Sequence, residues 1–294
     1  MKFAIFGKRR QSPDDIARID RLFSLLEGKG VFTCVESKFY AAMTAELGRP
    51  LPADDIFDGS DFTADIVLSI GGDGTFLRTA RRVGAKETPI IGFNTGHLGF
   101  LAEESLDDAA SIVDNLLEGR YFTEPRSLLE ASIKGGDHDR LLAGHSYALN
   151  EVAVLRHDSA SMISVHTRLD DIEIASYQGD GLIISTPTGS TAYNLSVGGP
   201  IVQPTAPCWV LSPVAPHALT MRPLVVSDSH LIELSVESRA DTYRINLDGH
   251  LVVLPTSVQM EIRRAPFRVN VIHRPGHTFV DTLSSKLLWG ISKR

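Results

Sequence analysis

A strand that runs directly into a glycine-rich turn decides the fold of the first part of the chain: Ala64-Asp65-Ile66-Val67-Leu68-Ser69-Ile70-Gly71-Gly72-Asp73-Gly74-Thr75. Residues 64–70 are apolar on both faces, as is typical of a buried parallel strand. Residues 76–83 continue with apolar side chains at helical spacing. In open α/β sheets, ligands bind beyond the carboxyl end of such a strand, at the N-terminus of the next helix. The stretch therefore predicts both a fold class and a ligand site.

Strand and helix signals alternate on both sides of this turn. Short apolar strands are expected at residues 3–6 and 89–93. Ser12-Pro13 has the residue types of a helix N-cap and first turn, and Ser105 begins another capped helix. Because strands and helices alternate with short links, we expect an α/β domain with an open parallel sheet over residues 1–125.

The spacing of apolar residues changes to a period of two in the second part of the chain. Apolar and polar residues alternate over 163–169, and Asp248-Gly249 has the residue types of a hairpin turn. The alternation continues as far as Val271. Many short alternating strands predict an all-β domain, a sandwich or layered sheets, over residues 126–275.

The end of the chain departs from this pattern. Residues 281–290 have apolar side chains at helical spacing. We therefore expect residues 276–294 to leave the all-β domain and to pack on the α/β domain.

Composition excludes several classes of protein. The chain has 294 residues and a net charge of −7, which supplies no general basic field for nucleic acid. No apolar run approaches the roughly 20 residues that span a bilayer, and the N-terminus holds five uncharged residues between basic ones, too few for a signal peptide. Cys34 and Cys208 have no metal or disulfide spacing. We expect a cytoplasmic two-domain protein without nucleic-acid or membrane partners.

The chemistry of the glycine turn depends on Asp73. Glycines let the backbone approach a phosphate, and a helix N-terminus favours an anion. A carboxylate inside such a turn would repel phosphate unless a metal ion or a substrate hydroxyl lies beside it, which indicates general-base or metal chemistry. The alternative is a structural turn in which Asp73 is the helix N-cap. The chain has neither the GxxxxGK[ST] loop of P-loop ATPases nor a GxGxxG after a strand.

Small hydroxylated residues crowd a second segment: Gly179-Asp180-Gly181-Leu182-Ile183-Ile184-Ser185-Thr186-Pro187-Thr188-Gly189-Ser190-Thr191-Ala192-Tyr193. Hydroxyls and exposed backbone N–H groups suit ribose and phosphate oxygens, and Tyr193 offers an aromatic face. A Ser/Thr-rich turn before a short helix is the alternative. Gly189-Ser190-Thr191-Ala192 lacks the second glycine of a nucleophile elbow, so a serine hydrolase is not expected.

Three further features are ambiguous. Asn150-Glu151 is a polar pair inside an apolar strand, which indicates a site, an edge strand or a bulge. His97 and His145 lack partners at metal-ligand spacing, so we expect structural or surface histidines. Three arginines within residues 78–82 indicate a solvated helix face that could also contact phosphate.

The order and spacing of these motifs resemble those of bacterial NAD kinases. The resemblance rests on the turn at residues 71–75, on Asn94-Thr95-Gly96-His97-Leu98-Gly99-Phe100, on Asn150-Glu151 and on residues 179–199. The run from Asp180 to Tyr193, followed by Gly198-Gly199-Pro200-Ile201, is highly specific. The glycine turn alone also resembles diacylglycerol-type lipid kinases, and phosphofructokinases carry a related motif.

The resemblance implies an N-terminal α/β domain, a C-terminal all-β NAD-binding domain and an active site between them. It implies transfer of the γ-phosphoryl of ATP to the 2′-hydroxyl of the adenosine ribose of NAD, which gives NADP and ADP. Mg²⁺ or another divalent cation would accompany ATP, and no protein side chain is predicted as a metal ligand. Family members form dimers and tetramers, so a homo-oligomer is expected.

The resemblance also implies roles for single residues. Asp73 would accept the proton, with Gly74 in contact with substrate and Phe100 near the adenine. Asn150 and Glu151 would hold the ribose and adenine of NAD. The other residues expected to line the dinucleotide are Asp180, on the nicotinamide side, and Thr188, Thr191, Ala192, Tyr193, Asn194, Leu195, Ser196 and His250. Three positions depart from the pattern of close relatives, namely Ser161, Gln178 and His250, and they put the nicotinamide-side and phosphate-side contacts in question.

Two other functions stay open at this point. One is a lipid kinase of the diacylglycerol type, although the chain has no amphipathic basic stretch for a membrane surface. The other is a non-catalytic dinucleotide sensor, which the intact Asp73 disfavours. Both are separated from an NAD kinase by incubation with NAD, ATP and Mg²⁺ and a search for NADP.

Overall fold

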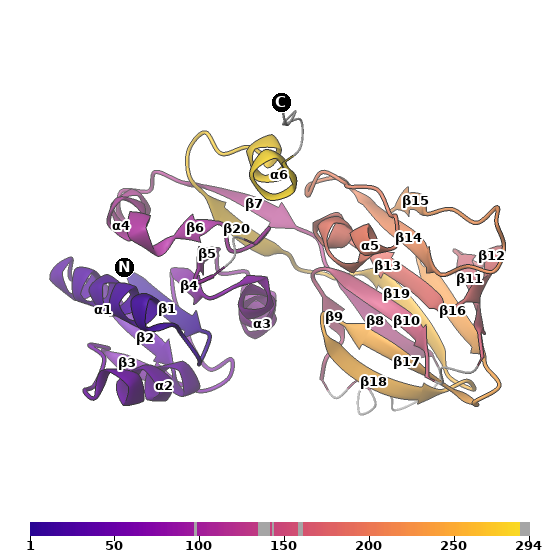
Figure 1. The fold of residues 1–294 in the computed structure, drawn as a ribbon, viewed down its shortest axis with the longest axis horizontal. Helices are drawn as coiled ribbons and strands as arrows, with labels where there is room; N and C mark the ends of the chain where they lie inside the picture. The colour runs from indigo at the N-terminus through magenta and orange to yellow at the C-terminus, as the bar shows by residue number, and fades with distance from the viewer. Residues whose placement is uncertain (97–98, 135–141, 143, 158–160, 289–294) are drawn as a thin grey trace. The chain divides into compact units, whose positions relative to one another are not determined.

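The structure is a computed structural model that describes residues 1–96, 99–134, 142, 144–157 and 161–288. The chain divides into two compact units (Figure 1). Unit 1 comprises residues 1–125 and 269–294, and unit 2 comprises residues 126–268. The sequence places residues 269–275 in the all-β domain, and that assignment is wrong: strand β20 (Val269–His273) pairs in parallel with a strand of the α/β sheet.

The sheet of unit 1 has the strand order β3-β2-β1-β4-β5-β20-β7, and β6 pairs with β5 off this path. The strands are β1 (Lys2–Gly7), β2 (Phe32–Glu36), β3 (Asp55–Phe57), β4 (Ile66–Ile70), β5 (Ile90–Asn94), β6 (Glu104–Ser105) and β7 (Phe122–Arg126). The pairings from β3 through to β20 are parallel, so the predicted α/β sheet is confirmed. Strand β3 was not predicted from the sequence.

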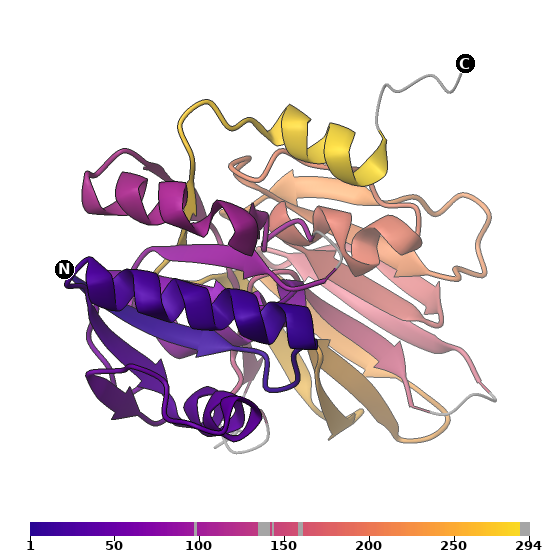
Figure 2. The ribbon, with the colours of Figure 1, turned by 60° about the vertical axis from the view of Figure 1, so that its left-hand side comes forward.

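Helices cover the sheet of unit 1. They are α1 (Pro13–Gly28), α2 (Ser37–Leu47), α3 (Asp73–Val83), α4 (Ala109–Leu117) and α6 (Phe279–Leu287). Figure 2 shows α1 lying alongside the strands. Ser12 caps α1 by accepting a hydrogen bond from the backbone N–H of Asp15, as predicted. Fully buried side chains that include Ile19 and Phe23 of α1 and Phe93 of β5 form the core of this unit.

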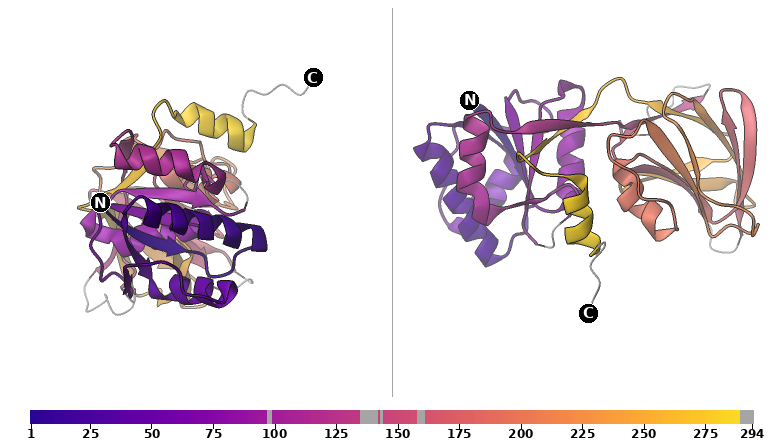
Figure 3. Two further views of the ribbon diagram at one scale, coloured as in Figure 1. Left: turned by 90° about the vertical axis from the view of Figure 1, so that its left-hand side faces the viewer. Right: turned by 90° about the horizontal axis from the view of Figure 1, so that it is seen from above.

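Unit 2 consists of two six-stranded antiparallel sheets, ordered β15-β14-β13-β10-β17-β18 and β12-β11-β16-β19-β8-β9, which appear as layers in the right-hand view of Figure 3. The strands are β8 (Leu129–Lys134), β9 (Tyr147–Ala148), β10 (Glu151–Arg156), β11 (Ile163–Leu169), β12 (Ile172–Gly179), β13 (Gly181–Ser185), β14 (Cys208–Val214), β15 (Leu224–Ser227), β16 (Ile232–Glu237), β17 (Thr242–Leu247), β18 (His250–Pro255) and β19 (Gln259–Arg264). One hydrophobic core joins side chains of both sheets, among them Trp209 and Ile262. The prediction of layered β sheets is confirmed.

The second half of the chain contains the predicted hairpin turn at Asp248-Gly249 and the predicted C-terminal helix. Asp248 and Gly249 have φ values of 48° and 86°, the left-handed pair that a tight hairpin between β17 and β18 requires. The C-terminal helix α6 begins at Phe279, two residues earlier than expected, because Thr278 and Asp281 form a capping box there. No helix among the residues that the structure describes is long and apolar enough to cross a membrane.

Candidate active site

The carboxylate of Asp73 binds three successive backbone N–H groups of the segment that follows β5. Phe100 donates to Oδ2 at 2.8 Å, and Leu101 and Ala102 each donate to Oδ1 at 3.0 Å. Asp73 is the first residue of α3, whose N-cap is Gly72 without a side-chain cap bond. The alternative in which Asp73 caps the helix is therefore wrong: its carboxylate is directed across to a neighbouring segment.

Glycines on both sides of this contact make it sterically possible. A Cβ on Gly99 would overlap the carboxylate of Asp73, and a Cβ on Gly92 of β5 would lie 2.7 Å from the carbonyl oxygen of Leu101. The space beyond Gly72 is open, and beyond Gly74 the guanidinium of Arg78 is 3.9 Å away. The turn thus holds its carboxylate firmly and leaves the outer side of the helix N-terminus clear for a ligand.

A basic pocket of about 420 Å³ lies in unit 1 between the carboxyl end of β1 and the exposed side of α3. Its basic lining residues are Lys8, Arg9, Arg10, Lys38, Arg78 and Arg82, with Glu36 as the acidic one. Burial and the neighbouring positive charges of Arg9 and Arg81 lower the pKa of Arg78. Six cations around one cavity favour a multiply charged anion. In open α/β sheets, ligands bind at the carboxyl ends of the strands where the strand order reverses. The basic pocket lies at such a point, because the strand order of this sheet reverses at β1.

In unit 2, Asp248 has the same type of contact that Asp73 has in unit 1. Its carboxylate accepts backbone N–H groups from Leu149 at 2.6 Å, Asn150 at 2.9 Å and Glu151 at 3.1 Å. The sequence identified Asp248 only as a turn residue, because its partners are almost a hundred residues away. The hairpin turn therefore fixes the backbone on which the polar pair Asn150-Glu151 is displayed.

Glu151 has a buried carboxyl group whose pKa is strongly raised. Burial and the nearby negative charge of Asp248 raise the pKa of Glu151 to about 7. A hydrogen bond from the backbone of Tyr193 acts in the opposite direction but is the smaller effect. Its Oε2 has no hydrogen-bond partner among the residues that the structure describes. A buried acceptor without a partner is a candidate for binding a hydroxyl of a ligand.

The hydroxyl-rich segment packs closely against this strand. Thr186 donates from its hydroxyl to the carbonyl oxygen of Leu149 at 2.6 Å and from its N–H to that of Asn150 at 2.9 Å. A Cβ on Gly189 would overlap the carbonyl oxygen of Asn150, so the approach requires glycine there. Thr188 is buried and its hydroxyl accepts a hydrogen bond from Arg126. These contacts bring Asn150, Glu151 and the start of the segment together.

The rest of the segment divides into exposed and structural side chains. Tyr193 is 37% exposed and starts the short helix α5 (Tyr193–Ser196), while Thr191, Ala192 and Leu195 are half-buried. Asn194 is fully buried. Its amide donates to the carbonyl oxygens of Ser190 and Pro200 and accepts from the hydroxyl of Ser212, so all of these bonds hold the loop in shape.

The structure gives the remaining predicted residues other partners. Asp180 forms an ion pair with Arg156, Nε to Oδ1 at 3.1 Å. The rings of His250 and His145 are in contact, with centroids 3.7 Å apart. Gln178 is exposed and accepts the backbone N–H of His217. Ser161 is half-buried, and His97 lies outside the described residues.

Lys286 of α6 is a residue that sequence reasoning missed. Burial lowers the pKa of Lys286, and the negative charges of Glu103 and Asp73 act in the opposite direction. Its ammonium has no hydrogen-bond partner within the described part of the chain. The sequence signal was only a lysine in a predicted helix, which is ordinarily a solvated residue.

A glycine turn at the N-terminus of α3, with Thr75 in a pocket lined by six cations, is the arrangement expected of a nucleotide-dependent phosphotransferase. Residues 4–121 match the family model of the ATP-NAD kinase N-terminal domain, and residues 149–274 match that of the ATP-NAD kinase C-terminal domain. The chain therefore belongs to the ATP-NAD kinase family, and the prediction of an ATP-dependent NAD kinase is confirmed.

Relatives and solved structures agree with this assignment. The chain is 45% identical to the NAD kinase of Bacteroides fragilis and 41% identical to that of Porphyromonas gingivalis, covering the whole chain and at least 99% of each relative. An NAD kinase from Archaeoglobus fulgidus, solved in complex with ATP, superposes with a TM-score of 0.70 at 26% identity and 94% coverage of both chains. Yeast NADH kinase complexed with NADH shares the fold, with a TM-score of 0.85 at 22% identity over 100% of this chain and 89% of that one.

Proposed function

We propose that the chain transfers the γ-phosphoryl group of ATP to the 2′-hydroxyl of the adenosine ribose of NAD, giving NADP and ADP. The hydroxyl oxygen forms the new bond to phosphorus, the bond from phosphorus to the β–γ bridging oxygen breaks, and the hydroxyl proton is accepted by Asp73. The observation that carries this proposal is the carboxylate of Asp73, held by three backbone N–H groups at the open N-terminus of α3.

The geometry of Asp73 suits a proton acceptor that need not move. A carboxylate offers about four acceptor positions, and three are occupied by Phe100, Leu101 and Ala102. Oδ2 receives only one of these bonds, so this oxygen is the one that can accept a proton. General-base assistance of this kind contributes roughly 10²- to 10⁴-fold to a rate.

The basic pocket suits the phosphates of the donor. Phosphoryl transfer depends on positioning and on charge neutralisation more than on covalent chemistry. Lys8, Arg9 and Arg78 line the same pocket as Thr75 of the glycine turn, so they can neutralise phosphate oxygens beside the turn. Mg²⁺ carried by ATP supplies further neutralisation of the phosphates when it is bound. The one unoccupied acceptor position of Asp73 is needed for the hydroxyl proton, so the ligands of the ion would come from phosphate and water.

In unit 2 we propose that Asn150 and Glu151 bind the adenosine ribose of NAD, with the unpartnered Oε2 of Glu151 as acceptor for a ribose hydroxyl. The side chains proposed to line the dinucleotide are Thr188, Thr191, Ala192, Tyr193, Leu195, Ser196 and His250, with Asp180 on the nicotinamide side, Phe100 near the adenine and Gly74 in contact with substrate. For Asn194, burial supports a role in shaping the loop.

A direct assay tests the proposal. The purified chain is incubated with NAD, ATP and Mg²⁺, and NADP is detected by an NADP-specific dehydrogenase, with an Asp73→Asn chain as the matched control. We expect the unaltered chain to form NADP and the Asp73→Asn variant to form none. Phosphorylation of diacylglycerol instead, or dinucleotide binding without turnover, would establish one of the alternative functions.

Two further properties stay proposals. Cys34 and Cys208 are free thiols, which agrees with a cytoplasmic location. A homo-oligomer, dimer or tetramer, is proposed from the resemblance to family members.

A further inference from the structure

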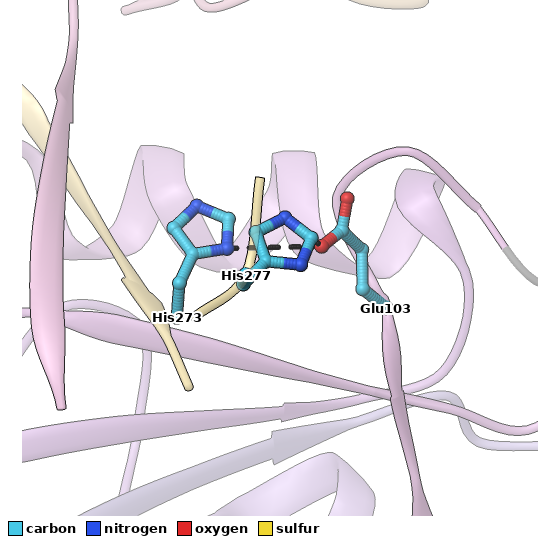
Figure 4. Close-up of side chains that lie close together, drawn as sticks. All are labelled: Glu103, His273 and His277. Atoms are coloured by element: carbon cyan, nitrogen blue, oxygen red, sulfur yellow. Dashed lines mark ion pairs between the residues drawn. The ribbon is translucent and has the colours of Figure 1, made fainter. Parts of the chain in front are cut away.

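Glu103, His273 and His277 of unit 1 bring one carboxylate and two imidazoles together (Figure 4). Oε2 of Glu103 lies 3.1 Å from Nε2 of His277 and 3.7 Å from Nδ1 of His273. The two rings are stacked, with centroids 4.5 Å apart and planes 3° from parallel. The donor atoms of the three residues all lie within 4.8 Å of one another.

These separations match those of a metal site. Bonds of about 2.0–2.1 Å from a zinc ion to imidazole nitrogen and carboxylate oxygen, in tetrahedral directions, place neighbouring donor atoms about 3.3 Å apart. The distances of 3.1 Å and 3.7 Å from Oε2 of Glu103 to the two imidazole nitrogens lie on either side of that value. Because the two rings are parallel and stacked, one imidazole must turn about its side-chain torsions before a single ion can lie in the plane of both rings.

The surroundings orient each donor atom. His273 is 5% exposed, and its second nitrogen, Nε2, makes no hydrogen bond among the described residues but lies 3.6 Å from Oε1 of Glu124. Histidines that ligate a metal commonly direct their second ring nitrogen to a carboxylate in this way. The hydroxyl of Thr282 donates to Oε1 of Glu103 at 2.9 Å, which leaves Oε2 directed at the two imidazoles.

We propose that Oε2 of Glu103, Nδ1 of His273 and Nε2 of His277 bind a divalent transition-metal ion of the zinc type. Two imidazole nitrogens and one carboxylate oxygen suit zinc and its neighbours in the first row, whereas Mg²⁺ and Ca²⁺ prefer oxygen ligands throughout. A fourth position remains for water. The side chain of His277 is 24% exposed, which provides a path for the ion.

The site would join three parts of unit 1 that are distant in sequence. His273 is the last residue of β20, and His277 directly precedes the Thr278 cap of α6. Glu103 directly follows Ala102, whose backbone N–H binds the carboxylate of Asp73. A bound ion would thus link the C-terminal segment to the loop whose backbone holds the carboxylate of Asp73.

Metal binding by the full chain tests the proposal without reference to activity. The protein is stripped with a chelator and titrated with Zn²⁺ by calorimetry and with Co²⁺ by visible absorption, which reports four-coordinate cobalt. We expect one site per chain, and binding at least tenfold weaker in each of Glu103→Gln and His277→Gln. Glu124→Gln should weaken binding by roughly 10- to 100-fold, because its carboxylate faces Nε2 of His273 and the loss of a carboxylate that orients a ligating histidine has this effect.

His217→Gln is the matched control, because His217 is an exposed imidazole of unit 2; its affinity should equal that of the unaltered chain. Equal affinity of His277→Gln, or no binding of either ion by the unaltered chain, would overturn the proposal. X-ray absorption of the zinc-loaded unaltered chain decides the matter even if the variants do not fold: two imidazole donors support the site, and a shell of oxygens alone refutes it.

Discussion

The carboxylate of Asp73 occupies the space that a side chain on Gly99 would fill. The two residues belong to different segments, and the absence of a Cβ at residue 99 allows the carboxylate to reach the N–H groups of residues 100–102. Position 99 thus determines where the proposed proton acceptor is held.

Gly99→Ala should reduce turnover at least tenfold while the chain remains folded, because the new methyl group displaces the carboxylate by an ångström or more and misplacement on this scale is costly in catalysis. Steady-state kinetics with NAD and ATP measure the effect. Gly96→Ala is the control, since a Cβ on Gly96 meets nothing within 4 Å. Equal turnover of the two variants would show that the contact does not set the position of Asp73.

Asp73→Asn should lower kcat at least 100-fold through loss of the proton acceptor. It should also destabilise the chain by about 1–3 kcal/mol, because an amide NH₂ would face backbone donors and leave one of them without a partner. Urea unfolding measures the stability, and calorimetry checks that the affinity for NAD is kept. A folded variant with near-normal turnover would remove Asp73 from the proposed role.

The raised pKa of Glu151 predicts how stability depends on pH. The folded chain retains a proton on Glu151 up to about pH 7, whereas an ordinary glutamate releases it near 4.5. The folded state therefore binds more protons than the unfolded state in this window, so this residue lowers stability as pH rises from 4.5 to 7, by up to about 3 kcal/mol.

Glu151→Gln should abolish that part of the pH dependence. The difference in free energy of unfolding between the variant and the unaltered chain should therefore favour the variant more at pH 8 than at pH 5. Urea unfolding at the two values measures it, with Glu173→Gln, an exposed glutamate on β12, as control. The same substitution should weaken binding of NAD if Oε2 accepts a ribose hydroxyl. An unchanged dissociation constant by calorimetry would refute that assignment.

Arg78→Met should raise the KM for ATP by roughly 10- to 100-fold, the effect of losing one charge-assisted hydrogen bond worth about 1.5–3 kcal/mol. The KM for NAD should change less than the KM for ATP, because Arg78 lines the basic pocket proposed to hold the phosphates of ATP. Arg81→Met on the same helix is the control, since Arg81 does not line that pocket. An equal rise in the KM for ATP in both variants would indicate that the total positive charge of α3 matters, and not a direct contact of Arg78 with phosphate.

Local patterns were the part of this molecule that the sequence could predict. The cap at Ser12, the strand before Gly71 and the hairpin at Asp248-Gly249 each depend on neighbours within a few residues, and each is found in the structure. Strand β20 could not be assigned, because a short alternating strand fits a β sandwich and a mostly parallel sheet equally well, and only its pairing with β5 decides.

The contacts that build the sites were beyond the sequence because they join distant residues. Asp73 and Ala102 are 29 residues apart, and Asp248 and Leu149 are 99 residues apart. His273 and His277 did carry a signal, two histidines four residues apart, but Glu103 lies 170 residues before His273 and was not connected to them. Burial, which shifts the pKa of Glu151, likewise depends on the complete fold.

The position of β20 between β5 and β7 has a consequence for how the protein is made. The ribosome delivers the first seven strands of unit 1 before any strand of unit 2, yet β7 has no neighbour in its sheet until residues 269–273 emerge. Unit 2 can therefore be synthesised and can fold completely before the last residues of unit 1 have been made. The domain that begins the chain is therefore the last to be completed, and a truncation that removes β20 and α6 would damage the first domain rather than the second.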